Sequence, residues 1–121
     1  MNKIKIHNPV LSNYLIVIYN CDYEKLNKYL KKEYNIGIEN NEYNNGCFFK
    51  AEADESEYYF IWIEKPHKDS YTYSLVAHEI VHFLFQLFDD RGINIDKEND
   101  ETFAYHLQFY LKEIFEKIYK R

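Results

Sequence analysis

Short apolar runs in the first half of the chain predict β-strands. Residues 14–20, YLIVIYN, are rich in β-branched side chains, which is typical of a strand buried on both faces. Residues 47–53 and 57–64 are two further candidate strands, and the connection between them, DES, has the length of a hairpin turn. KIKI at residues 3–6 is a candidate for a short additional strand.

The segment between the first and second predicted strands has helical periodicity. Residues 23–34, YEKLNKYLKKEY, place their apolar side chains on one stripe, and Asp22 precedes them as a candidate N-cap. The polar residues 39–46, ENNEYNNG, are rich in turn formers and are expected to be a loop.

A long apolar helix is predicted after the strands. It is capped by Asp69 or Ser70 and runs to about Arg91, where Gly92 suits the left-handed position after a helix. A loop at residues 93–99 follows.

A final helix begins after Asn99 or Asp100 and continues close to the C-terminus. The predicted order is β-α-β-β-α-α. With no linker or repeat, residues 1–121 are expected to form a single α+β domain.

Composition narrows the possible functions. The chain has 121 residues, and its hydrophobic fraction of 46% is that of a globular protein. The net charge of −5 argues against nucleic-acid binding. No apolar run reaches the roughly 20 residues of a membrane-spanning helix. The N-terminus lacks the features of a signal peptide, and Cys21 and Cys47 are not spaced as a metal or redox motif, so we expect a cytoplasmic protein.

The most specific chemical signal is HEIVH at residues 78–82. His78 and His82 are four residues apart, so their rings lie on one face of the long helix and can supply two corners of a tetrahedral metal site. Glu79 projects beside the pair, where it can accept a proton from a metal-held water. We expect the helix to be central and its polar stripe to face the metal. Other side chains share that face approximately: Tyr71, Leu75, Phe85, Gln86 and Asp89.

The alternative without a metal is a pair of core histidines bonded to backbone or tyrosine partners, with Glu79 in solvent. A catalytic zinc site needs a third protein ligand as well as an open position. Glu101, 19 residues after His82, is the preferred third ligand, because a helix N-terminus favours negative charge. His106 is the second choice, and Glu98 and Asp100 are further candidates.

HEIVH followed by ETFAYH resembles the zincin superfamily of metallopeptidases, in the branch where a glutamate on the next helix completes the site. The layout is also similar to small phage-encoded zinc peptidases. The resemblance implies a minimal zincin-like fold, a small mixed sheet of three to four strands packed with the HExxH helix and a C-terminal helix. It also implies Zn²⁺ held by His78, His82 and Glu101, with Glu79 as general base.

Thermolysin-like enzymes carry an aspartate where this chain has Tyr105, so Tyr105, Asp89 or a backbone carbonyl is left to orient a ligand imidazole. The donor that stabilises the oxyanion is also open. The candidates are Tyr71, Tyr73, Tyr105, His106 and His67. Residues 57–64 are the candidate strand along which an extended peptide would align.

The expected function is therefore zinc-dependent hydrolysis of a peptide bond in a protein or peptide substrate, with no nucleic-acid or membrane partner. The alternative is a non-catalytic binding or structural protein that keeps the scaffold, with or without the metal, such as a phage–host interaction factor or a virion component. If the chain is phage-encoded, the host cytoplasm or the virion is the expected location. Substrate identity and oligomeric state are not readable from the residues.

Overall fold

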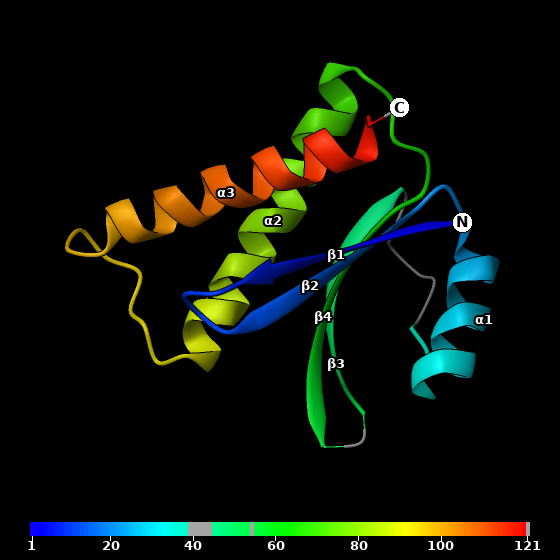
Figure 1. The fold of residues 1–121 in the computed structure, drawn as a ribbon, viewed down its shortest axis with the longest axis horizontal. Coiled ribbons are helices and arrows are strands. Elements are labelled where there is room, and N and C mark those ends of the chain that lie inside the picture. Colours follow the sequence, from blue (N-terminus) through cyan, green and yellow to red (C-terminus); the bar gives the residue numbers. More distant parts are fainter. Residues whose placement is uncertain (39–44, 54, 121) are drawn as a thin grey trace. The chain divides into compact units, whose positions relative to one another are not determined.

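The computed structural model describes residues 1–38, 45–53 and 55–120. Over these residues the fold class is α+β, with a four-stranded mixed sheet and three helices that include a C-terminal helix, as predicted (Figure 1). Backbone contacts divide the chain into two compact units, Met1–His67 and Lys68–Arg121, here called the sheet unit and the helical unit. A single domain over residues 1–121 stays a prediction.

The sheet unit contains all four strands and the first helix. In chain order its elements are β1 (Asn2–Asn8), β2 (Asn13–Tyr19), α1 (Tyr23–Tyr34), β3 (Gly46–Ala53) and β4 (Ser56–Ile63). The candidate strand at KIKI is therefore present as part of β1. The strand order is β1-β2-β4-β3, in which β2 and β4 are parallel and both edge strands are antiparallel to their neighbours. Most of the predicted loop at 39–46, and Asp54 of the predicted hairpin turn, lie outside the described residues.

The two central strands are buried on both faces, as their apolar runs predict. Leu15 to Tyr19 of β2 and Tyr59 to Ile63 of β4 are all buried. Successive side chains of a strand point to opposite faces, so this continuous burial means that both faces are covered. Parallel strands whose two faces are both covered normally lie in the interior of a sheet.

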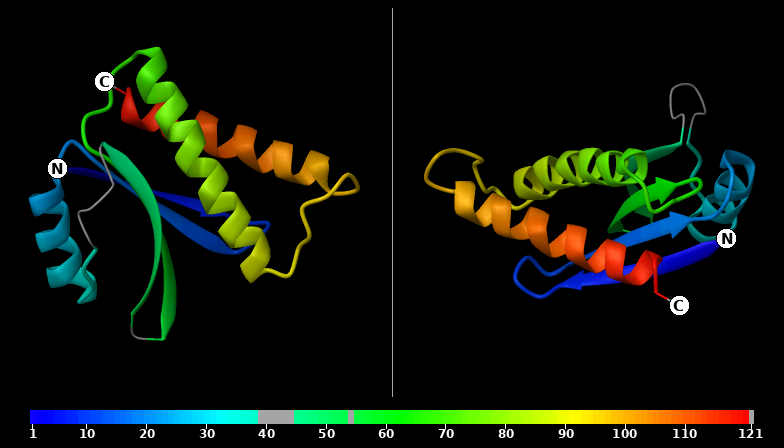
Figure 2. Two further views of the ribbon diagram at one scale, coloured as in Figure 1. Left: turned by 180° about the vertical axis from the view of Figure 1, so that it is seen from behind. Right: turned by 90° about the horizontal axis from the view of Figure 1, so that it is seen from above.

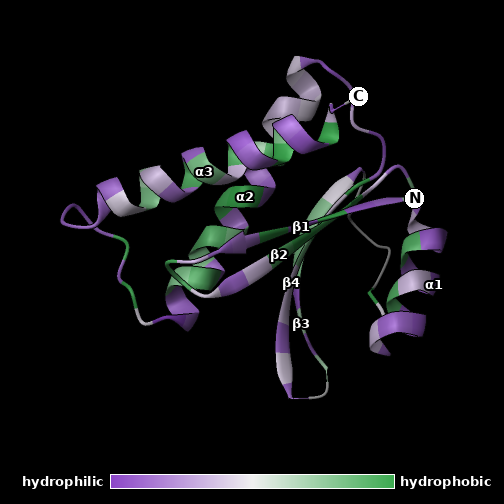
Figure 3. Ribbon diagram, in the orientation of Figure 1, coloured by the Kyte–Doolittle hydropathy of each residue, from purple (hydrophilic) through white to green (hydrophobic). Residues whose placement is uncertain are grey.

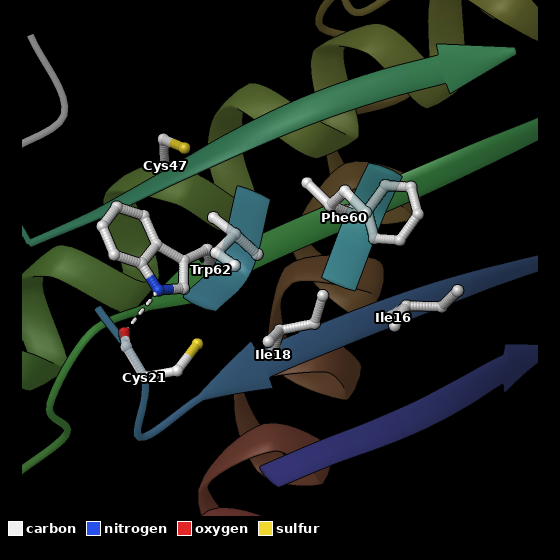
Figure 4. Packing of buried hydrophobic residues seen from close by; sticks show 8 residues of the cluster. Ile16, Ile18, Cys21, Cys47, Phe60 and Trp62 are labelled. Atoms are coloured by element: carbon white, nitrogen blue, oxygen red, sulfur yellow. Dashed lines mark hydrogen bonds between the residues drawn. The ribbon is translucent and has the colours of Figure 1, made fainter. Parts of the chain in front are cut away.

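Helix α1 and one face of the sheet share a hydrophobic cluster. Leu26 and Leu30 of α1 belong to it together with Phe60 and Trp62 of β4. The Trp62 indole N–H donates a hydrogen bond of 3.0 Å to the backbone carbonyl of Cys21 (Figure 4). This bond satisfies the one polar group of the buried indole, so the cluster carries no penalty for it.

Both cysteines of this cluster, Cys21 and Cys47, are buried thiols that form no disulfide. Burial raises the pKa of the Cys21 thiol, which keeps it in the protonated, less reactive form. Helix α1 itself is amphipathic, with hydrophobic and hydrophilic residues alternating around its axis (Figure 3).

The helical unit consists of α2 (Ser70–Asp90) and α3 (Asp100–Ile118). Asp69 caps α2 by accepting a 2.9 Å hydrogen bond from the Thr72 backbone N–H. Gly92 follows the end of α2 with a left-handed φ of 68°, as predicted. Asn99 stands at the N-cap position of α3, but its side chain makes no cap hydrogen bond.

Aromatic side chains join the two helices of this unit, which cross one another in Figure 2. Phe83 packs edge-on against Tyr110 with ring centroids 5.0 Å apart, and Phe88 packs against Phe103 at 5.8 Å. Near the other end Tyr73 packs against Phe115 at 5.1 Å. Early residues of α2 thus meet late residues of α3, which is the antiparallel arrangement of a helical hairpin.

Candidate metal centre on helix α2

His78 and His82 lie one turn apart on α2, and their rings converge. Their Nε2 atoms are 3.1 Å apart, and the ring planes are inclined at 78°. Two nitrogen ligands at about 2.0–2.1 Å from a tetrahedral zinc ion would lie roughly 3.3 Å apart. The observed separation therefore fits two neighbouring corners of a zinc site. The same separation also suits a hydrogen bond in which one imidazole N–H donates to the other ring.

The two imidazoles are open to solvent, whereas the carboxylate is buried. The His78 side chain is 65% exposed and His82 is exposed as well, whereas the Glu79 side chain is 10% exposed. Each residue turns the helix by about 100°, so Glu79 lies at the edge of the arc that is buried, next to Val76 and Phe83. The histidines lie on the adjacent arc, which is open.

The Glu79 carboxylate remains close to the pair. Its Oε2 atom is 3.9 Å from Nε2 of His78, although its side chain is largely withdrawn from solvent. A carboxylate at this distance can accept a proton from a water molecule held by the imidazoles or by an ion between them. The arrangement of two open nitrogen donors beside a shielded carboxylate is therefore compatible with general-base chemistry.

The described residues show no third ligand grouped with the pair. Across residues 1–38, 45–53 and 55–120, no three His, Cys, Asp or Glu side chains are grouped so that they could hold a metal ion. The predicted ligand Glu101 is exposed in the first turn of α3. The ligand set therefore matches a catalytic zinc site only in its first two members, and Glu101 stays a prediction.

His106, the second choice for this ligand, is buried and packs against Phe88 with ring centroids 5.6 Å apart. Its Nδ1 lies 2.8 Å from the carbonyl oxygen of Thr102. A carbonyl only accepts, so Nδ1 donates in this bond, and the neutral ring in this tautomer has its lone pair on Nε2. These contacts describe a packed core histidine whose remaining nitrogen is chemically able to bind a metal.

The other candidate residues lie on several elements. Tyr105 is 63% exposed on α3, and its ring contacts His106. Tyr73 packs against the end of α3, and His67 lies in the sheet unit. The catalytic roles of these side chains stay predictions.

Sequence reasoning missed one property of α2, which is the character of its open face. From Ser70 to Phe88 the only charged residue is Glu79, and Glu79 is buried. The exposed residues on this stretch include Tyr71, Phe85 and the two histidines. The absence of charge was visible in the sequence, but only the structure identifies which arc of the helix is open.

Comparisons with known proteins found no match: no protein-family model matches the chain, and no curated protein or solved structure is significantly similar to it. Among the described residues, no helix combines the length and the apolar character needed to cross a membrane.

Proposed function

We propose that the chain is a zinc-dependent peptidase that hydrolyses a peptide bond with Glu79 as general base. The observation that carries this proposal is the 3.1 Å separation of the His78 and His82 Nε2 atoms, with the shielded Glu79 carboxylate beside them. The separation suits two corners of a tetrahedral zinc ion. The neighbouring carboxylate has no evident role in a purely structural metal site.

The three residues of HEIVH have separate tasks in this proposal. His78 and His82 would hold the ion, which would supply an electrophile and lower the pKa of a water molecule to about 7. Glu79 accepts a proton from the attacking water and returns it to the leaving amine. The low exposure of Glu79 excludes bulk water, which would otherwise compete for that proton.

The proposal takes its third ligand from helix α3. Glu101 is our candidate, because it lies in the first turn of α3, where the helix dipole favours a carboxylate. For Glu101 to bind the same ion as the histidines, the start of α3 has to approach the middle of α2. Tyr105, one turn after Glu101, is the candidate to orient a ligand imidazole.

The proposed substrate is a protein or peptide. Selectivity would come from docking of a particular partner. A cytoplasmic location is part of the proposal, and two cysteines that form no disulfide support it.

Metal content and hydrolysis test the proposal together. We expect purified protein to bind about one zinc per chain, and Glu79→Gln to keep the zinc but to lose hydrolysis by at least about 100-fold. His82→Ala should lose both, whereas His7→Ala, which removes an exposed histidine of β1, should lose neither. Hydrolysis that persists at the wild-type rate in Glu79→Gln would contradict the assignment of the base.

A non-catalytic binding or structural protein is the second candidate. The open, uncharged face of α2 favours it, because such a face suits contact with a macromolecular partner. Zinc binding with no hydrolysis above background by either the wild type or Glu79→Gln, across a broad peptide library, would support this candidate instead.

A further inference from the structure

The open face of α2 has the spacing of a helix–helix seam. Its members follow one another at intervals of four, three, four, three and four residues. They are Tyr71, Leu75, His78, His82, Phe85 and Asp89. A repeat of this kind places side chains in line along a helix, as in two-stranded helical pairs. We call these six residues the α2 seam.

The α2 seam is open to solvent even though it is largely apolar or aromatic. Tyr71 is 56% exposed and Phe85 is 53% exposed, and both are among the most exposed large hydrophobic residues that the structure describes. Solvent-facing sides of helices normally carry charged residues. From Ser70 to Phe88, about 28 Å of helix, the seam carries none.

Helix α3 does not cover this seam. The aromatic contacts of α2 with α3 run through Tyr73, Phe83 and Phe88, which lie on other arcs of the helix. Phe85 of the seam also reaches α3, through an edge contact with Phe103 at 5.7 Å. That contact orients the Phe85 ring while about half of the side chain remains open.

The spacing of the α2 seam is symmetric about Ile80. His78 and His82 lie two residues from Ile80, Leu75 and Phe85 lie five, and Tyr71 and Asp89 lie nine. In an antiparallel pair of identical helices with a two-fold axis at this level, each residue faces its symmetric counterpart. Leu75 of one chain would then face Phe85 of the other, and each histidine pair would face its copy.

We propose that two copies of this chain pair through the α2 seam around one shared zinc ion, held by His78 and His82 of both chains. Each chain contributes two corners of a tetrahedron, because its Nε2 atoms are 3.1 Å apart. Four imidazoles then close the site, which answers the lack of a third ligand among the described residues of one chain.

Pairing of this kind depends on the metal. One helix packed on one helix buries less than the roughly 1,200 Å² typical of stable interfaces. Each chain also carries a net charge of −5, so two copies repel one another. The ion supplies the missing attraction and fixes the register.

The zinc site between two copies uses the same histidines as the proposed peptidase, but pairing does not require hydrolysis. A zinc ion bound by four imidazoles has no open position for water. The paired form of the protein would therefore be catalytically inactive. The two proposals also differ in stoichiometry, since the pair holds one zinc for two chains and the peptidase holds one zinc for each chain.

Sedimentation equilibrium with added zinc chloride tests the pairing. We expect the mass to double as zinc reaches half an equivalent per chain, and to return to that of one chain when a chelator is added. His82→Ala should stay a single chain, whereas Glu79→Gln should still pair. Zinc bound at one per chain with no change in mass overturns the pairing and leaves the peptidase proposal standing. No zinc binding overturns both.

A charge-pair cycle tests the antiparallel register. Leu75→Lys alone and Phe85→Glu alone should each weaken zinc-dependent pairing at least tenfold, because each places a charge against an apolar side chain of the other copy. The double variant should recover most of that loss, since the introduced lysine and glutamate face each other only in the antiparallel pair. Circular dichroism checks that each variant is folded. A double variant weaker than either single one overturns this register.

Discussion

Helix α1 of the sheet unit and helix α2 of the helical unit both bury an apolar stripe, but they expose opposite kinds of surface. Every exposed residue of α1 is charged: Glu24, Lys25, Lys28, Lys31, Lys32 and Glu33. The exposed residues of α2 before Asp89 carry no formal charge when histidine is neutral. The face of α1 is therefore an ordinary solvated surface, whereas the face of α2 has the composition of a site or an interface.

The buried faces and the N-caps of α1 and α2 are alike, and the contrast between the two helices lies in their exposed faces. Leu26 and Leu30 fix α1 in its cluster, and Val76, Ile80 and Phe83 are equally inaccessible on α2. Both helices also begin at an aspartate whose side chain accepts a backbone hydrogen bond three residues later. Their folding can therefore be explained in the same terms, and the contrast between their exposed sides belongs to function.

The largest effects should come from the buried faces, and they should be alike in the two helices. Leu30→Ala on α1 and Phe83→Ala on α2 each remove a fully buried side chain. We expect losses of about 2–5 and about 3–5 kcal/mol in unfolding free energy, measured by urea denaturation. Phe85→Ala and Lys31→Ala, at exposed positions, should change it by about 0.5 kcal/mol or less. A large loss in Phe85→Ala would mean that the α2 seam is structural.

Much of the sheet unit could be predicted from its sequence, because its apolar runs are short and distinct. Burial of β2 and β4 on both faces follows from runs such as residues 14–20, whose side chains are apolar at successive positions. The parallel pairing of β2 with β4 could not be predicted. Side-chain periodicity indicates which faces are buried, and it carries no information on which strand is the neighbour.

The candidate site was predictable in its local part only. The i, i+4 spacing alone brings His78 and His82 together, because helix geometry fixes it. Which arc of α2 is covered depends on tertiary packing, so the sequence could not indicate that Glu79 is buried and the histidines open. The position of Glu101 likewise depends on how α3 folds back, which is not a local property.

Smaller effects should separate helices that have a side-chain cap from the one that does not. Asp22→Ala and Asp69→Ala each remove the acceptor of a 2.9 Å hydrogen bond from a backbone N–H. We expect each to cost about 1 kcal/mol in unfolding free energy. Asn99→Ala should cost less, because Asn99 makes no cap bond to α3 and instead donates to the Asn94 carbonyl. Equal losses at all three positions, measured by thermal melts, would show that the cap bonds are not what distinguishes them.

The smallest expected effect is on the unfolding free energy at alkaline pH, through a tyrosine of the sheet unit. Burial raises the pKa of Tyr34, the last residue of α1, from 10.0 to about 12. Its ring packs against Tyr58 and Phe60, at centroid distances of 4.9 and 5.2 Å, so ionisation would place a charge beside apolar rings.

The sign of the effect follows from the direction of this shift. A folded-state pKa above the unfolded value contributes stability that is fully present below about pH 10 and is lost as the pH rises toward 12. Tyr34→Phe cannot ionise, so its unfolding free energy should fall less steeply than that of the wild type between pH 9 and about pH 11.5. Tyr14→Phe, at an exposed tyrosine of β2, is the matched control. Urea denaturation at several pH values measures both slopes, and equal slopes for Tyr34→Phe and wild type would contradict the assignment.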